Sequence, residues 1–423
     1  MKKRSRFRFN INSLFKWLYP GMKIKRWIMV SLFGVFMTIA GSALFSSEIV
    51  QVLRTVGLAT VFCGVFLTIL GIVKLIKSFV MAFIPRKEKD IVDILYQKVH
   101  LARGPKIVTV GGGTGLAMIL HGLKSYTNNI SAVVTVADSG GSSGRLREQF
   151  DVLPPGDIRN CLVALADAEP LMQKLFQLRF DKGGELQGHN FGNLFITAMT
   201  EVTGDFELAV KESSKVLAIR GQVIPSTLEK VSLVAEYEDG SIVEGEDRIP
   251  KKNLPIKRVF LKPAAPAATE EALKAIKEAD IVILGPGSLY TSIIPNLLVK
   301  GVTETIVNSS AVKVYVCNVM TQPGETDGYT ASRHAETIIA HSHLTIMDYC
   351  VVNTARASDE LLARYKEEDA FPVVADTDKI RKLGYKVIEE RVINLADFVR
   401  HDSARLAKTI VDLATRNKNA KKK

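Results

Sequence analysis

The sequence predicts an α/β fold, a Rossmann-like parallel sheet with helices on both faces, together with an N-terminal two-helix transmembrane hairpin. Three observations lead to this prediction. Two long apolar stretches without charge lie close together near the N-terminus. From residue 105 onward, short apolar strands alternate with helical stretches, which is typical of a parallel sheet. Glycine-rich turns follow several of these strands, as in sheets that bind ligands at one edge.

The two apolar stretches cover residues 27–45 and 56–73, and neither contains a charged residue. A helix of about 20 residues crosses the hydrocarbon core of a bilayer, so each stretch is long enough to span it. Residues 46–55 between them are expected to form a short turn on the far side. A buried helical hairpin is one alternative. A cleaved signal peptide is another, although a second apolar stretch follows the first directly.

Basic residues around these stretches account for the whole net charge. Residues 1–90 hold 15 Lys and Arg against three Asp and Glu, which gives +12, the same as the complete chain. By the positive-inside rule both flanks are cytoplasmic. We therefore expect a multi-pass protein of the cell membrane whose main domain lies in the cytoplasm. The rest of the chain is neutral and has no basic footprint for nucleic acid, so no nucleic-acid partner is expected.

The chain divides into five expected segments. They are a basic cytoplasmic N-terminus (1–26), the transmembrane hairpin (27–73), a connector (74–104), the folded domain (105–415) and a basic tail (416–423). The spacing of apolar residues in 91–99 predicts a short amphipathic helix within the connector. The four cysteines lie far apart without C-x-x-C spacing, as in proteins of a reducing compartment.

Within the folded domain the patterns predict the elements in order. Strands are expected at 107–110, 132–136, 281–284 and 312–318, and helices at 116–124, 270–279 and 406–413. Alternating residues in 228–248 around Asp239-Gly240 predict a β-hairpin, since Asp-Gly is a favoured two-residue turn.

The first candidate site is the glycine-rich loop after the first strand, where Gly112, Gly113, Thr114 and Gly115 follow Gly111. Such a loop lets backbone N–H groups approach an oxyanion, and the following helix adds its dipole. A tight turn without a ligand is the alternative. Further loops begin at Gly140 and at Gly285, the latter with Gly287 and Ser288, and all three should gather at one edge of the sheet.

Known phosphate-binding fingerprints do not fit this loop well. The dinucleotide pattern needs glycine where Leu116 stands, and the Gly-Lys-Ser/Thr of a Walker A loop is absent. Asp138 ends the second strand, where an acidic residue often meets a ribose. A nicotinamide cofactor is therefore not excluded, but it is not favoured.

Several polar residues near the other loops are further candidates for ligand binding. Asp138, Ser139, Ser142 and Arg145 belong to a loop that resembles an anion nest, with a solvated polar loop as the alternative. Arginine can bind phosphate through two hydrogen bonds. The remaining candidates are Arg159, in a turn where Asp157 is a plausible helix cap, and Asn190 and Asn193, which either contact a ligand or start a helix. No metal-ligand set or catalytic triad can be assembled from spacing, and His341 and His343 are too poorly spaced for a metal pair.

Six segments resemble the CofD/YvcK family, and most closely its gluconeogenesis-factor branch. They are GGGTGL from Gly111, DSGGSSGRLR from Asp138, PPGDIRN from Pro154, GHNFGN from Gly188, GPGSLYTSIIPNLLV from Gly285 and CNVMTQPGETDGYTA from Cys317. They cover about residues 105–415 in the order of the family. The N-terminal hairpin is additional to the compact members of the branch.

The resemblance implies a Rossmann-like protein that binds a UDP-sugar such as UDP-N-acetylglucosamine and supports cell shape and envelope-precursor supply during gluconeogenic growth. It places Tyr365 and Arg400 at UDP-sugar pocket positions. An envelope-synthesis protein is an implied partner, and self-association stays open. The alternative is a 2-phospho-L-lactate transferase of deazaflavin biosynthesis, which uses a divalent metal. Where the branch shows two successive aspartates this chain has Asp138-Ser139, so it lacks one carboxylate for a metal.

Overall fold

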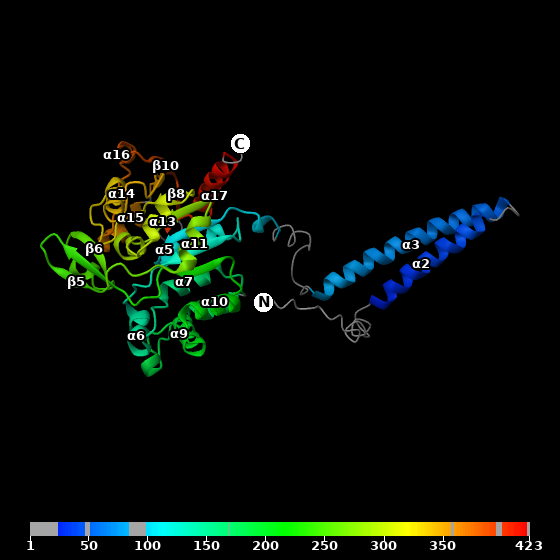
Figure 1. Cartoon of the computed structure of the whole chain (residues 1–423), viewed down its shortest axis with the longest axis horizontal. Coiled ribbons are helices and arrows are strands. Elements are labelled where there is room, and N and C mark those ends of the chain that lie inside the picture. Colours follow the sequence, from blue (N-terminus) through cyan, green and yellow to red (C-terminus); the bar gives the residue numbers. More distant parts are fainter. Residues whose placement is uncertain are drawn as a thin grey trace, which may run out of the picture. The chain divides into compact units, whose positions relative to one another are not determined.

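The computed structural model describes residues 24–46, 51–83, 99–168, 170–356, 359–394 and 400–420. They belong to two compact units, Met1–Tyr96 and Gln97–Lys423. Figure 1 shows two paired helices in the first unit and a sheet with helices in the second. The predicted fold class is confirmed for the second unit, and two apolar helices are present in the first.

The first unit is a pair of long helices, α2 (Ile24–Phe45) and α3 (Gln51–Phe83). Both are long and apolar enough to cross a membrane. α3 starts within the expected turn and continues ten residues beyond the expected end at Val73, because no proline or glycine interrupts the sequence from there up to Phe83. Most of the amphipathic helix expected in residues 91–99 lies outside the described residues.

Glycines at intervals of seven residues form the seam between these helices. They are Gly34 and Gly41 in α2 and Gly57, Gly64 and Gly71 in α3. An added Cβ on Gly64 would lie 2.5 Å from the Thr38 Oγ1 atom and 2.6 Å from the Thr38 backbone nitrogen. The two backbones therefore approach as closely as small residues allow, as in helix pairs of membrane proteins.

The second unit is built on a seven-stranded parallel sheet in the order β10-β9-β8-β7-β1-β2-β3. The strands are β1 (Ile107–Gly111), β2 (Ile130–Val134), β3 (Gln222–Pro225), β7 (Ile281–Leu284), β8 (Val312–Val316), β9 (Tyr349–Asn353) and β10 (Lys386–Glu390). Every residue of β1 and β7 is buried. Burial on both sides requires cover on both faces of the sheet.

The helices of this unit follow the strands in the expected alternation. They are α5 (Gly113–Leu123), α6 (Gly141–Phe150), α7 (Gly156–Leu165), α8 (Pro170–Gln177), α9 (Phe191–Thr203), α10 (Phe206–Val216), α11 (Glu270–Glu278), α12 (Ile294–Leu297), α13 (Val302–Asn308), α14 (Ala331–Ala340), α15 (Asp359–Glu367), α16 (Thr377–Lys382) and α17 (Ser403–Ala420). α5 packs against both α7 and the C-terminal α17. Segments from both ends of the folded domain thus cover the central strands.

A small antiparallel sheet is inserted between β3 and β7. It consists of β4 (Ser232–Tyr237), β5 (Ile242–Glu244) and β6 (Ile256–Lys262). The hairpin predicted around Asp239-Gly240 is confirmed by the antiparallel pairing of β4 with β5. Near the C-terminus, β11 (Ile393–Asn394) pairs with β12 (Arg400–His401).

Candidate functional site

The candidate site lies where the order of the sheet reverses. From β1 the chain adds β2 and β3 on one side, and it later adds β7 to β10 on the other side. The reversal lies between β1 and β7, and open α/β sheets bind ligands in the crevice outside the carboxyl ends of two such strands. The glycine-rich loops that begin at Gly111 and Gly285 follow these two strands, so the sheet brings them together as the sequence predicts.

The two loops touch each other through backbone atoms. An added Cβ on Gly115 would lie 2.8 Å from the Pro286 carbonyl oxygen and 3.0 Å from the Gly287 Cα atom. Gly113 has a φ of 65°, a conformation that favours glycine. Glycine is thus needed at position 113 for the backbone conformation and at position 115 for close approach.

The first turn of α5 points its backbone N–H groups toward this crevice end of the sheet. Gly112 precedes the helix and has no side chain that could cap it. The first N–H groups of a helix have no partner within the helix, and its dipole favours an anion at this end. The N–H of Gly113 donates to the carboxylate of Asp157.

A cavity of about 250 Å³ lies between the two loops. It is lined by Gly112, Gly113, Thr114, Gly115, Met118, Pro286, Gly287, Ser288, Ser292, Asn318, Val319, Met320, Gln322 and His401. All candidates from the first and third glycine loops lie here. The residues after β8 and His401 were not expected from spacing. Gln322 connects the segment after β8 to the loop that begins at Gly285, because its Nε2 donates to Ser288 Oγ at 2.6 Å.

Among the described residues, His401 is the only one with a titratable side chain that lines this cavity. It is 7% exposed, and neither ring nitrogen has a hydrogen-bond partner in the described part of the chain. Burial lowers the pKa of His401 to about 4, although the nearby Cys317 carbonyl acts in the opposite direction. The ring is therefore neutral at physiological pH and offers one donor and one acceptor.

The two residues placed by family resemblance lie beside this cavity. Val319 and Met320 line both it and a neighbouring cavity of about 420 Å³. The half-buried Tyr365 packs against Val319. Arg400 forms β12 next to His401, but its side chain lies outside the described residues. Tyr365 thus lies near the crevice.

Three of the polar candidates form a buried network of their own. Ser142 Oγ lies 3.1 Å from His189 Nδ1 and accepts from the Asn190 N–H. Asn190 caps α9 by accepting from the N–H of Asn193, whose Nδ2 donates to Ser143 Oγ. Of the two roles left open by the sequence, the structure supports helix-start hydrogen bonds for Asn190.

The remaining candidates contact protein groups near the end of β2. Asp138 accepts from the Gly140 N–H, and Ser139 donates to the carboxylate of Asp247. Arg145 donates to the carbonyl of Gln187, and Arg159 donates to Asn160. The expected nest is present as a loop before α6, and its Arg145 is held by a protein partner. Arg159 belongs to α7, and its buried Nε has no hydrogen-bond partner among the described residues.

Asp157 was expected to cap α7, and this prediction is wrong. α7 starts at Gly156 and its N-cap is Pro155, so Asp157 lies inside the first turn without capping it. Its carboxylate instead reaches the glycine-rich loop, within 2.3 Å of an added Cβ on Gly112. Asp157 thus contacts the distant glycine-rich loop instead of capping its own helix.

Four carboxyl groups gather near this loop. Burial raises the pKa of Asp157 to about 7, and the Asp138 carboxylate adds to the rise. Burial likewise raises the pKa of Glu246 to about 8 and that of Glu325 to about 7. Glu325 accepts from Thr291 through one oxygen, while Oε2 has no partner among the described residues. Burial, with nearby like charges adding to it, keeps Asp157, Glu246 and Glu325 partly protonated near neutral pH.

A divalent metal does not fit these carboxylates as the structure places them. Among the described residues, no three His, Cys, Asp or Glu side chains are arranged to hold one metal ion. Ser139, where the family resemblance implies a second aspartate, donates its hydroxyl to the Asp247 carboxylate. The carboxyl groups would have to move before they could share one ion.

The sheet, its reversal point and the paired glycine loops define an open, doubly wound α/β protein with a ligand crevice at the carboxyl edge. The family model described as 2-phospho-L-lactate transferase CofD matches residues 107–393. The chain therefore belongs to the CofD family, and its relatives place it in the gluconeogenesis-factor branch.

The relatives differ in how much of the chain they match. A putative gluconeogenesis factor of Nostoc sp. is 47% identical over 96% of this chain and 94% of its own length. The gluconeogenesis factor of Bacillus subtilis is 49% identical over 74% of this chain and 99% of its own length. An X-ray crystal structure of a Bacillus halodurans protein is 48% identical, with a TM-score of 0.72, and covers 73% of this chain and 100% of its own. The folded domain thus exists alone in some relatives, while the Nostoc protein matches most of the hairpin as well.

Proposed function

We propose that this chain is a membrane-tethered regulatory protein that binds a nucleotide-sugar of the UDP-N-acetylglucosamine type and supports cell shape and envelope-precursor supply during gluconeogenic growth. The observation that carries the proposal is the crevice between β1 and β7. There the first turn of an 11-residue helix, which no side chain of its N-cap residue caps, meets a second glycine loop at backbone contact. This arrangement suits a diphosphate.

The neighbouring cavities suit the rest of a nucleotide-sugar. The crevice holds about 250 Å³ and shares Val319 and Met320 with the cavity of about 420 Å³. A diphosphate at the glycine loops would leave the base and the sugar to extend toward these residues, Tyr365 and His401. Aromatic and polar groups placed around an elongated pocket are typical of such ligand sites.

A binding role accounts for the cavity better than catalysis does. Glycines, serines, amides and apolar side chains dominate its lining, and the titratable group described there, His401, is neutral and buried. A general acid or base works best with a pKa near the operating pH, which the value of about 4 for His401 does not provide. The carboxyl groups whose pKa values are raised to about 7 or 8 do not line this cavity. Ligand occupancy would then act on a partner protein of envelope synthesis.

The tether is part of the proposal. Large apolar side chains cover the outer faces of both helices, among them Met29 at 68% exposure and Phe62 at 70%. A soluble core helix buries such residues, and water does not tolerate an apolar surface of this extent. Lipid would cover it, with the basic flanks on the cytoplasmic side.

Calorimetric titration of the full-length chain in detergent with UDP-N-acetylglucosamine tests the binding claim. We expect saturable heat, and weaker binding of UMP, which lacks the second phosphate and the sugar. No saturable heat at millimolar ligand, from a chain shown to be folded, would remove the proposal.

The second candidate is a 2-phospho-L-lactate transferase. The four carboxyl groups near the glycine loop favour it, because metal-dependent transfer needs such ligands. Their arrangement disfavours it, since no three of them share a metal position among the described residues. Mass spectrometry of the chain with a deazaflavin precursor, activated phospholactate and magnesium decides between the two. Formation of the joined product would establish the transferase.

A further inference from the structure

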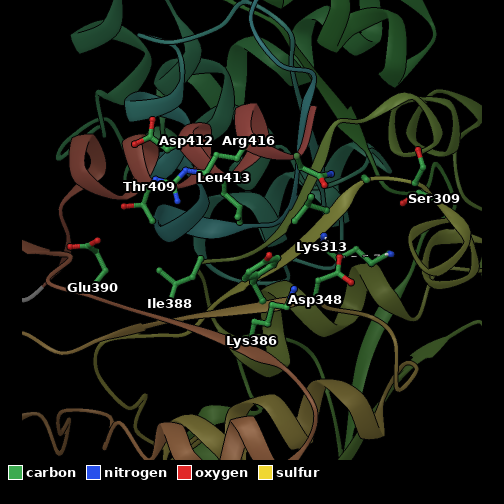
Figure 2. A pocket seen from close by; sticks show the side chains of 15 residues that line it. Ser309, Lys313, Asp348, Lys386, Ile388, Glu390, Thr409, Asp412, Leu413 and Arg416 are labelled. Carbon is green, nitrogen blue, oxygen red and sulfur yellow. Dashed lines mark hydrogen bonds and ion pairs between the residues drawn. The ribbon is translucent and has the colours of Figure 1, made fainter. Parts of the chain in front are cut away.

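A second and larger cavity lies at the opposite edge of the sheet. It measures about 930 Å³ and is lined by the starts of β8 and β9, by the whole length of β10 from Lys386 to Glu390, and by α17 (Figure 2). Val312, Tyr349 and Lys386 are the first residues of their strands. The crevice, in contrast, lies outside the carboxyl ends of β1 and β7. The two cavities share no described lining residue.

Three cations of this cavity have weak or no partners among the described residues. Lys313 is 12% exposed, and its Nζ lies 4.0 Å from the Asp348 carboxylate, at the limit of an ion pair. Lys386 lies over the Tyr349 ring at 5.3 Å, and neither it nor Arg416 forms an ion pair with a described residue. Figure 2 shows the two lysines on either side of Asp348 and Arg416 reaching in from α17. Such a cluster favours an anionic ligand.

The other polar residues that line this cavity can form hydrogen bonds with hydroxyl groups of a ligand. Asp348, Glu390 and Asp412 supply carboxylate acceptors, and Ser309 and Thr409 supply hydroxyls. The ring of Tyr349 is half-buried and forms an apolar surface beside them. Carboxylates at the same site disfavour a ligand made of phosphates alone, because they repel it.

We propose that this cavity is a second ligand site, for a phosphorylated sugar or polyol. Lys313, Lys386 and Arg416 bind the phosphate, and the carboxylates accept hydrogen bonds from the hydroxyl groups. The ring of Tyr349 packs against the carbon skeleton. This site does not depend on the nucleotide-sugar proposed for the crevice.

Calorimetry of the full-length chain in detergent tests the proposal with glucose 6-phosphate as the probe. Saturating UDP-N-acetylglucosamine is present in one series and absent in another, so that binding at the crevice is recognised separately. We expect saturable binding in both series. Glucose and inorganic phosphate should each bind at least about tenfold more weakly, because each lacks one half of the polar contacts.

Two charge reversals locate the site. Lys386→Glu should weaken glucose 6-phosphate binding by about tenfold or more, since it replaces a charge-assisted hydrogen bond by repulsion. Lys408→Glu, at an exposed position of α17 outside the lining, should leave it unchanged. Thermal melting of both variants verifies that they fold. No saturable binding at millimolar probe, equal affinity for inorganic phosphate, or equal affinity in a folded Lys386→Glu chain would each overturn the proposal.

Discussion

Replacing Gly115 by alanine tests the contact that shapes the crevice. The new Cβ would lie 2.8 Å from the Pro286 carbonyl oxygen, whereas ordinary contact begins at 3.4 Å. The opposing atoms belong to backbone, so they cannot rotate away as a side chain would. Either α5 or the Pro286 loop must therefore move by several tenths of an ångström, and the crevice between them widens.

We expect Gly115→Ala to lower the stability of the fold only slightly and to lower the ligand affinity strongly. Alanine gains about 1 kcal/mol over glycine inside a helix, while overpacking costs about 1–3 kcal/mol. The free energy of unfolding should thus fall by only about 0–2 kcal/mol. A misplaced backbone at a binding loop costs far more, and we expect UDP-N-acetylglucosamine affinity to fall about 10- to 100-fold.

Calorimetric titration and urea denaturation measure the two effects. Gly111→Ala is the matched control, because an added Cβ there comes no closer than an ordinary 3.5 Å, to Leu116 Cδ1. It should keep most of the affinity. Unchanged affinity of a folded Gly115→Ala chain, or a greater loss in the control, would refute the reasoning.

Four further predictions concern the carboxyl cluster and the hairpin. Because the pKa of Asp157 is raised from 3.8 to about 7 in the folded chain, its ionisation costs stability that grows between these pH values and stays constant above them. Asp157→Asn should therefore raise the melting temperature at pH 8 and leave it nearly unchanged at pH 4, and the reverse pattern would show that the carboxylate stabilises the fold. The difference between the two pKa values limits the gain to about 4 kcal/mol. Gly64→Leu should separate α2 from α3, since the new side chain meets the Thr38 backbone, whereas Phe62→Leu on the exposed face should leave the helices paired. Crosslinking between engineered cysteines across the seam measures the pairing. Equal crosslinking in both variants would contradict close packing of the two helices at Gly64. A reporter fused after Lys423 should be active in the cytoplasm and one within residues 46–55 outside it, while a chain starting at Lys89 should stay soluble and keep its ligand affinity. A C-terminal reporter active only outside would reverse the topology, and a truncated chain that aggregates would make the hairpin part of the fold.

Local patterns were sufficient for the strands that bear the glycine loops. β7 has the predicted bounds and β1 differs by one residue, because each is a short apolar run that ends in glycine. The predicted strand at 132–136 begins two residues earlier, at Ile130, since the apolar run itself does not mark its start. The two loops could be placed together from the parallel topology alone.

Contacts between distant segments could not be predicted in this way. His401 and Gln322 enter the crevice from segments more than 200 residues beyond Gly112, and nothing in their local spacing indicates it. Asp157 has the local pattern of a helix cap, but a contact with the Gly113 N–H holds it elsewhere. Family resemblance, and not spacing, indicated that Tyr365 lies near the site.

The most direct test of the central claim is a crystal structure of the folded domain with UDP-N-acetylglucosamine. We expect the diphosphate between the β1 and β7 loops, within hydrogen-bond distance of the N–H groups of Thr114 and Gly115. We also expect the sugar or the base to lie against Val319. A diphosphate bound away from the glycine loops, with the crevice empty, would contradict the account.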